Sequence, residues 1–228
     1  MSTPEKYTAT IKKKQWLTGD VFFVTLALDH PMQFAAGQFV MLDLPQPGEH
    51  PRPFSLVNAP EKTGSRTIEI CLKRYETSVT APYLDSLPDG SPVTLRGPFG
   101  FFMLRDSPRP VFFVATGVGI APMISMLRDE QNKKSTREKQ MLFGLRHEDD
   151  LMFENELAKL IPEAMLTLSQ PSDAWTAARG RVTEHLSELP DPVHYDFYIC
   201  GAPEMVKDSR ALLIERGVPQ EQIYFEIF

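Results

Sequence analysis

The stretch that decides the fold runs Val111-Phe112-Phe113-Val114-Ala115-Thr116-Gly117-Val118-Gly119-Ile120-Ala121-Pro122. Its first residues are apolar and largely β-branched or aromatic, which is typical of a central parallel strand covered on both faces. The two glycines permit a tight turn and the close approach of a ligand to the backbone. Beyond them, apolar residues recur at helical spacing, and Pro122 suits a first helical turn. The stretch predicts a strand, a glycine turn and a helix, an arrangement that directs backbone N–H groups at a phosphate.

The glycine spacing in this stretch is Gly-x-Gly-x-x-Pro, so it lacks the third glycine of the usual dinucleotide fingerprint. Two other interpretations compete with a nucleotide site. One is a membrane span, but the uncharged run 111–127 is shorter than the ~20 residues that a span requires and contains glycine and proline. The other is a plain strand–helix connection without a ligand. Agreement from other parts of the chain is needed to favour the nucleotide site.

The composition narrows the classes of function. The 228 residues suffice for one large or two modest domains, and a net charge of −6 argues against a nucleic-acid partner. The one cationic run, Lys12-Lys13-Lys14, is interpreted as a solvated strand edge. Two cysteines, Cys71 and Cys200, are too few for a four-cysteine iron–sulfur cluster, a disulfide framework or an all-cysteine zinc site. We expect an organic cofactor, no metal and, because the charged N-terminus has no signal-peptide core, a cytoplasmic protein.

The first hundred residues show the patterns of β-strands. Apolar residues alternate along 21–28 and 67–73, and shorter strands are predicted at 38–44, 54–58 and 92–96, with a short helix at 83–87. Short strands separated by frequent turns predict a small antiparallel β-barrel.

A polar, proline-bearing segment at 105–110 marks the predicted boundary between two domains, residues 1–106 and residues 107–228. After it, predicted strands at 141–145, 164–168, 197–200 and 223–228 alternate with helices at 153–161, 181–189 and 203–216. Such alternation predicts a parallel sheet with helices on both faces, so the fold class is an antiparallel barrel followed by an α/β domain.

Five motifs in order cover nearly the whole chain: Arg52-Pro53-Phe54-Ser55, Gly97-Pro98-Phe99-Gly100-Phe101-Phe102, Thr116 to Pro122, Phe143-Gly144-Leu145-Arg146 and Cys200-Gly201-Ala202-Pro203-Glu204-Met205. In this combination the chain resembles the ferredoxin–NADP reductase family of flavin- and nicotinamide-binding reductases. The first motif is similar to the family's flavin motif and the second to the turn that closes its barrel. The third and fourth are similar to its nucleotide motifs, and the fifth to the motif near the nicotinamide.

The resemblance implies roles for the residues of the first motif. Arg52 would bind the flavin phosphate, Phe54 would pack on the isoalloxazine or its ribityl chain, and Ser55 would hydrogen-bond to N5. A donor at N5 stabilises the charge that arrives there with a hydride. Further flavin-binding candidates are Pro53, Leu72, Lys73 and Thr80, of which Leu72 and Lys73 would act through their backbone.

The resemblance also implies a nucleotide site and three catalytic candidates, Ser55, Cys200 and Glu226. Gly117 and Gly119 would admit the pyrophosphate, and Cys200 would border the nicotinamide, although a buried core cysteine is the commoner case for its residue type. Glu226 matches an acidic residue near the flavin in the family, and the final residue, Phe228, matches a terminal aromatic that shields the flavin. The other nucleotide-binding candidates are Thr116, Ile120, Pro122, Arg146, Cys200, Gly201, Pro203 and Met205.

One loop departs from the family pattern. Where the family often has a glycine-rich loop with Ser or Thr that holds the flavin pyrophosphate, residues 75–84 contain no glycine. Ala81 takes the position of the hydroxyl, or Thr80 takes it after a slip of one residue. This departure argues against tight binding of the adenylate half of FAD. The resemblance implies FAD as the flavin, and the departure leaves FMN or a loosely held flavin as the alternative.

The hydride donor is NADH or NADPH. A 2′-phosphate needs cationic or hydroxyl partners after the strand at 164–168. The sequence there is Ser169-Gln170-Pro171-Ser172-Asp173, with Arg179 and Arg181 further on, and repulsion by Asp173 favours NADH. The cluster His147-Glu148-Asp149-Asp150 is interpreted as a solvated loop in which Asp149 or Asp150 caps the next helix.

Together these features predict an NAD(P)H-dependent flavin oxidoreductase that passes hydride from nicotinamide C4 to flavin N5. Because the chain cannot hold a four-cysteine cluster, we expect the electrons to go to a separate acceptor: a ferredoxin, an oxygenase component or a haem protein. One alternative is a reductase of diffusible flavin. The other is a nucleotide-binding subunit without turnover, which the presence of Ser55 and Cys200 disfavours.

Overall fold

The computed structural model describes residues 3–45 and 49–227. Contacts divide the chain into two compact units. Unit 1 comprises the chain up to Leu104 together with Ala121–Glu130, and unit 2 comprises Arg105–Ile120 and the chain from Gln131 onward. The domain boundary between residues 106 and 107 stays a prediction.

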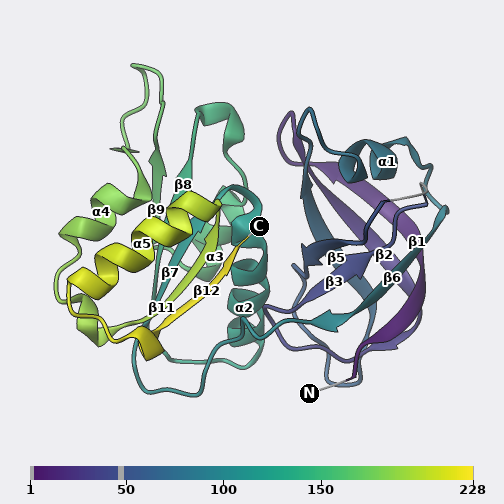
Figure 1. Cartoon of the computed structure of the whole chain (residues 1–228), viewed down its shortest axis with the longest axis horizontal. Helices are drawn as coiled ribbons and strands as arrows, with labels where there is room; N and C mark the ends of the chain where they lie inside the picture. Colours follow the sequence, from purple (N-terminus) through teal and green to yellow (C-terminus); the bar gives the residue numbers. More distant parts are fainter. Residues whose placement is uncertain (1–2, 46–48, 228) are drawn as a thin grey trace. The chain divides into compact units, whose positions relative to one another are not determined.

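Unit 1 is an antiparallel sheet whose strands lie in the order β4-β3-β6-β1-β2-β5 (Figure 1). An isolated bridge between Leu56 and Ile70 joins the chain after β4 to β5, the strand at the opposite edge, so the sheet curls into the predicted barrel-like form. β4 begins two residues before the predicted strand at 54–58. It ends at Ser55, because the chain then leaves β3 to make this bridge. The strands are β1 (Glu5–Trp16), β2 (Val21–Met32), β3 (Phe39–Leu42), β4 (Arg52–Ser55), β5 (Ser65–Lys73) and β6 (Pro92–Phe99).

The core of unit 1 lies inside the curled sheet. Alternate residues of β2 are buried as predicted, and helix α1 (Thr80–Ser86) adds Ala81 and Leu84 to the same cluster. This helix begins three residues before the predicted helix at 83–87, because Ala81 and Leu84 already face the core.

The interpretation of Lys12-Lys13-Lys14 as a solvated strand edge is wrong. The run belongs to β1, which lies between β6 and β2 in the interior of the sheet. Lys12 and Lys13 are exposed, but the ammonium of Lys14 is partly buried and donates to backbone carbonyls of α1 and of the residue after it.

Unit 2 is a parallel sheet with the strand order β10-β9-β8-β7-β11-β12. The deciding stretch forms β7, a 3₁₀ turn η1 and the start of α2, as predicted. Figure 1 shows α4 and α5 side by side on one face of the sheet, where they close a hydrophobic cluster with β7, β8 and β11. The strands are β7 (Val111–Thr116), β8 (Lys139–Leu145), β9 (Met165–Leu168), β10 (Ala178–Arg179), β11 (Asp196–Gly201) and β12 (Ile223–Ile227). The chain from η1 onward also forms helix α2 (Ala121–Asn132), which belongs to unit 1 up to Glu130. The remaining helices and turns of unit 2 are η1 (Gly117–Ile120), η2 (Glu148–Asp150), α3 (Glu154–Leu160), α4 (Val182–Glu188), η3 (Pro192–His194), α5 (Pro203–Glu215) and η4 (Gln220–Gln222).

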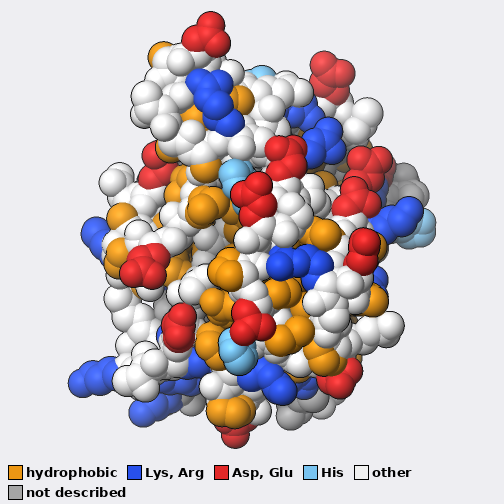
Figure 2. All heavy atoms as spheres, turned by 90° about the vertical axis from the view of Figure 1, so that its left-hand side faces the viewer, with side chains coloured by type: hydrophobic (Ala, Val, Ile, Leu, Met, Phe, Trp, Pro, Cys, Tyr) orange, Lys and Arg blue, Asp and Glu red, His pale blue; other side chains and the backbone are white. Residues whose placement is uncertain are grey.

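In the described part of the chain, no helix is long and apolar enough to cross a membrane. On the face drawn in Figure 2, side chains of both charge signs are interspersed with hydrophobic ones, so this face carries no continuous cationic stripe.

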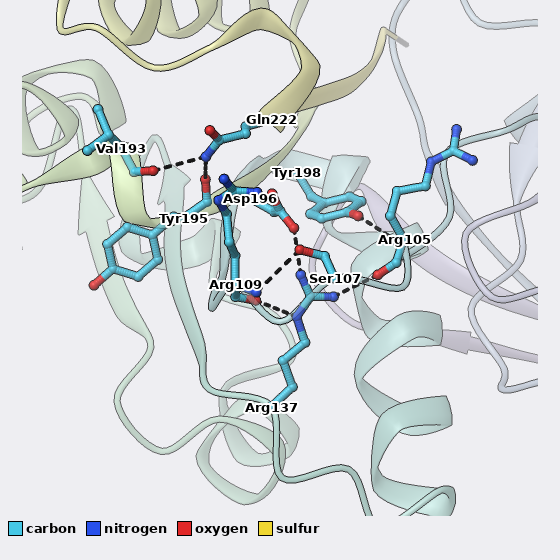
Figure 3. A network of polar contacts seen from close by, with 9 residues as sticks. All are labelled: Arg105, Ser107, Arg109, Arg137, Val193, Tyr195, Asp196, Tyr198 and Gln222. Atoms are coloured by element: carbon cyan, nitrogen blue, oxygen red, sulfur yellow. Dashed lines mark hydrogen bonds and ion pairs between the residues drawn. The ribbon is translucent and has the colours of Figure 1, made fainter.

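A polar network fastens the start of unit 2 to its sheet (Figure 3). The guanidinium of Arg137 pairs with the carboxylate of Asp196 at 2.8 Å and donates to the carbonyls of Arg105 and Arg109 at 3.0 and 2.6 Å. The Arg105 N–H donates to the hydroxyl of Tyr198 at 2.8 Å. Burial raises the pKa of this hydroxyl to about 12, so it stays protonated at physiological pH. Side-chain exposure is only 14% for Arg137 and 3% for Asp196, so the pair is almost dry.

We expect Arg137→Met to lower the free energy of unfolding of unit 2 by roughly 3 kcal/mol, because it leaves the buried carboxylate of Asp196 without its partner. Urea unfolding followed by circular dichroism measures the change. Arg96→Met, which breaks the exposed pair with Asp43, is the matched control and costs less than about 1 kcal/mol. Equal losses in the two variants would contradict the assignment.

Candidate functional site

The strand order of unit 2 reverses between β7 and β11. From β7 the chain adds β8, β9 and β10 on one side, whereas β11 and β12 extend the sheet on the other. In open parallel sheets this reversal leaves a crevice beyond the carboxyl ends of the two strands, and ligands bind there. The residues at these ends are Thr116, the last residue of β7, with Gly117 at the start of η1, and Cys200 and Gly201 on β11.

The two strand ends pack backbone to backbone. A Cβ on Gly119 would lie 2.5 Å from the carbonyl oxygen of Cys200 and from the Cα of Gly201, and a Cβ on Gly201 would overlap the hydroxyl of Thr116. That hydroxyl accepts a hydrogen bond from the Ala202 N–H at 3.2 Å. Only glycine therefore allows the turn after β7 to lie against the end of β11.

Gly117 differs from Gly119 in having open space around it. Its φ is +53°, and a Cβ built on it would meet nothing within 4 Å. The turn thus exposes backbone at the crevice without a side chain, as a phosphate-binding turn requires.

Cys200 and Glu226 are partners in the ladder between β11 and β12. Cys200 is fully buried, and this burial, with a smaller contribution from the charge of Glu226, raises the pKa of its thiol well above the usual value. The thiol is neutral at physiological pH, so it contributes shape and polarizability rather than a nucleophile. Because the thiol stays protonated in the folded state, its contribution to the free energy of unfolding is complete below a pH of about 9. This contribution decreases as the pH rises further.

The other nucleotide candidates lie at or near the carboxyl ends of the strands. Arg146 is exposed just after β8, and Pro203 and Met205 begin α5, where the Ser209 hydroxyl donates to the Met205 sulfur at 3.5 Å. Ile120 and Pro122 are buried. The prediction for Phe228 lies outside the described residues.

Residues that the sequence analysis considered as partners for a 2′-phosphate instead hold the loop after β9 in place. One Arg179 nitrogen donates to the carbonyls of Ser172, Asp173 and Trp175 at 2.9, 3.3 and 2.6 Å. The carboxylate of Glu148 accepts from the Ser172 hydroxyl at 2.6 Å and from its N–H at 2.9 Å. The hydrogen bond from the Ser172 hydroxyl is the main cause that lowers the pKa of Glu148, so this carboxyl is negative at neutral pH.

The predicted helix cap in the cluster 147–150 is wrong. Asp150 accepts from the N–H of His147 at 2.9 Å, within the turn η2, whereas α3 begins after Phe153, which makes no side-chain cap. Leu151 and Met152 lie between the turn and Phe153, so neither Asp149 nor Asp150 occupies the N-cap position of α3. The described residues contain no group of metal-ligating side chains.

In unit 1, the predicted flavin motif forms β4. Ser55 is 3% exposed, and its hydroxyl has no hydrogen-bond partner in the described part of the chain. A buried hydroxyl of this kind is unfavourable unless a ligand supplies the partner. Phe54 packs partly on the core, and Arg52 is exposed and pairs with Glu49 at 3.2 Å. These residues fit a flavin, because a phosphate can take over the Arg52 guanidinium and a ring nitrogen can satisfy Ser55.

The remaining flavin candidates lie at the end of β5 and the start of α1. Leu72 is buried in the core, so it offers a ligand only its backbone, as expected. The Lys73 ammonium pairs with Asp20 at 3.1 Å. Thr80, the first residue of α1, is 6% exposed, and Ala81 N–H donates to the Ser78 hydroxyl at 3.3 Å.

Two residues of α2 were missed by sequence reasoning. The Ser125 hydroxyl donates to the Asn58 carbonyl at 2.7 Å, and the Arg128 guanidinium pairs with Glu69 at 2.8 Å. These contacts fix the helix to unit 1. A serine in the middle of an apolar helix was the available signal.

Comparison with known proteins identifies both units. Residues 8–103 match the model of the oxidoreductase FAD-binding domain, and residues 113–211 match that of the oxidoreductase NAD-binding domain. The chain is 37% identical over 210 residues to ferredoxin–NADP reductase B of Sorangium cellulosum, covering 85% of this chain and 84% of that protein. It is 30% identical over 227 residues to the reductase component of propane 2-monooxygenase from Rhodococcus jostii, covering 93% of this chain. The chain spans only 60% of that relative's length.

Among solved structures, the Amycolatopsis cytochrome P450 reductase GcoB superimposes with a TM-score of 0.90 at 26% identity. The match covers 100% of this chain and 71% of GcoB.

We expect Gly117→Ala to weaken nucleotide binding while leaving the fold intact, because the new methyl group would occupy the open space at the crevice. The left-handed φ costs about 1 kcal/mol of stability for alanine. Gly90, with a φ of +91° and equally open surroundings in unit 1, is the matched control, so Gly90→Ala carries the same cost without the binding defect. Calorimetric titration with NAD⁺ and NADP⁺ measures the difference, and equal affinities in both variants would remove Gly117 from the site.

Proposed function

This chain belongs to the ferredoxin–NADP reductase family, and from that membership we propose how its residues divide the work of an NAD(P)H-dependent flavin oxidoreductase. Unit 1 binds FAD, and unit 2 binds the nicotinamide nucleotide at its β7–β11 crevice. The observation that carries the proposal is the buried hydroxyl of Ser55, which lacks a partner on the strand that carries the flavin motif.

The residues of unit 1 bind and orient the flavin. Arg52 exchanges its exposed pair with Glu49 for the flavin phosphate, and Phe54 and Pro53 form the surface against the ring. Ser55 donates its hydrogen bond to N5, and the backbone of Leu72 and Lys73 lines the other side. Thr80 binds the pyrophosphate. When bound, the flavin supplies the hydride-accepting and electron-releasing chemistry that side chains lack.

The residues of unit 2 position the hydride donor. Thr116, Gly117 and Gly119 receive the pyrophosphate, and the uncharged Cys200 borders the nicotinamide with Glu226 beside it in the ladder. Arg146, Ile120, Pro122, Gly201, Pro203 and Met205 complete the nucleotide site. No side chain needs to act as general acid or base in a direct hydride transfer.

We propose NADH as the preferred donor. The nitrogen of Arg179 that reaches the loop after β9 already donates to three carbonyls, and the carboxylate of Glu148 is fixed on Ser172 in the same loop. A 2′-phosphate would therefore meet a negative charge there.

Electrons leave for a separate redox protein. The chain has two cysteines and cannot hold a four-cysteine cluster. The names of its relatives indicate a ferredoxin or an oxygenase component as the acceptor. We propose a cytoplasmic location for this exchange.

The experiment that tests the proposal follows the visible spectrum of the protein after gel filtration, then adds NADH or NADPH without oxygen. A flavin spectrum that survives and bleaches stoichiometrically supports a reductase with a bound flavin. A colourless protein that oxidises NADH only with added FAD or FMN would replace it with a reductase of diffusible flavin. Absence of flavin reduction under all these conditions would refute the proposal that the chain is a flavin oxidoreductase.

We expect Ser55→Ala to slow reduction of the bound flavin by roughly 10²-fold, as for loss of one donor to a developing charge. The flavin-free variant should be at least as stable as the parent, because the hydroxyl it loses has no partner. Ser65→Ala is the matched control: Ser65 is also buried, but its hydroxyl accepts from the Glu61 N–H at 3.2 Å. This control should lose about 1 kcal/mol of stability and keep its rate. Stopped-flow absorbance and thermal unfolding separate the two results.

A further inference from the structure

A β-bulge turns Lys14 toward the inside of unit 1. β1 and β2 pair Ile11 with Leu26 and then Lys13 with Thr25, so Lys12 is an extra residue without a partner. Before the bulge, the buried residues of β1 are Tyr7, Ala9 and Ile11, at odd-numbered positions; after it, the one partly buried residue of β1 is Lys14, at an even-numbered position. Lys14 therefore faces the same side as its ladder partner Val24, which is fully buried.

The ammonium of Lys14 binds the C-terminal end of α1. It donates to the carbonyls of Leu84, Asp85 and Leu87 at 3.4, 2.5 and 2.8 Å. The last turn of α1 contains no basic residue of its own, so Lys14 supplies the cation that stabilises free carbonyls at a helix end.

α1 depends on such tertiary contacts. It has seven residues, which is too short for a stable helix in isolation, and its N-cap Val79 makes no side-chain hydrogen bond. Ala81 and Leu84 anchor one side of it in the core. Lys14 holds the C-terminal end of the helix, where Arg74 also pairs with the Asp85 carboxylate at the longer distance of 3.7 Å.

We propose that Lys14 is a positioning residue for the flavin: by holding the end of α1, it sets the place of Thr80, the first residue of that helix. The inference rests on the proposed function, in which Thr80 binds the flavin pyrophosphate. FMN shares the ring and the first phosphate of FAD but lacks its second phosphate and adenosine. Displacement of α1 therefore weakens FAD binding more than FMN binding.

The test titrates the flavin-free full chain with FAD and with FMN and follows flavin fluorescence. We expect Lys14→Met to raise the Kd for FAD about tenfold, the order of one hydrogen bond to a charged group, and to leave the Kd for FMN within about twofold. Lys14→Arg, which keeps the charge and the donors, restores the FAD affinity. Lys13→Met is the matched control, because the Lys13 ammonium contacts only the exposed Gln15 side chain among the hydrogen bonds described, and it changes neither constant.

A general loss of stability does not change the preference for FAD over FMN, so that ratio separates positioning from a purely structural role. An equal rise of the Kd for FAD and the Kd for FMN, or a lower unfolding temperature with unchanged FAD affinity, overturns this inference but leaves the proposed function standing. A parent chain that binds neither flavin overturns the proposed function as well. Should Lys14→Met not fold, Lys14→Gln, which keeps two N–H donors without the charge, gives the same comparison.

Discussion

The contact of Gly119 with the backbone of Cys200 and Gly201 is the constraint on which unit 2 depends. No side chain fits between these segments, so the turn after β7 can lie against β11 only when residues 119 and 201 are both glycine. This contact puts the Thr116 hydroxyl within reach of the Ala202 N–H and leaves Gly117 facing open space. The place where the strand order reverses thereby becomes a crevice lined by backbone. The proposed nucleotide site is thus a consequence of how two strand ends pack.

Local sequence patterns predict the elements because burial follows a strict period. The apolar alternation of β2 and the uninterrupted, β-branched and aromatic run of β7 both favour strands, and both elements form as expected. The same patterns cannot reveal contacts between distant segments. Lys14 lies in a run of three lysines that looks solvated, and only the bulge at Lys12 turns it inward. Arg137 likewise gives no local sign that it will pair with Asp196.

The motifs name candidate residues, but they do not predict the surroundings of those residues. The order of motifs indicated the flavin strand and the glycine turn, but not that Cys200 is fully buried beside Glu226 or that Arg179 is engaged by its own loop. The acidic cluster failed as a helix cap because Leu151 and Met152 separate it from Phe153, the N-cap residue of α3. A motif specifies residue types and spacing, whereas burial and hydrogen bonding depend on elements that the motif does not contain.

Ser55 links stability to function in unit 1. A buried hydroxyl without a partner costs about 1–3 kcal/mol, so the flavin-free chain holds β4 in an unfavourable state. A ligand that binds only the folded chain and supplies the missing partner recovers this energy and stabilises unit 1 by mass action. The same hydroxyl, fixed by its strand and kept from water, then needs no reorganisation when charge develops at its partner. Under the proposed function, the feature that weakens the empty barrel is therefore the one that would prepare it for electron transfer.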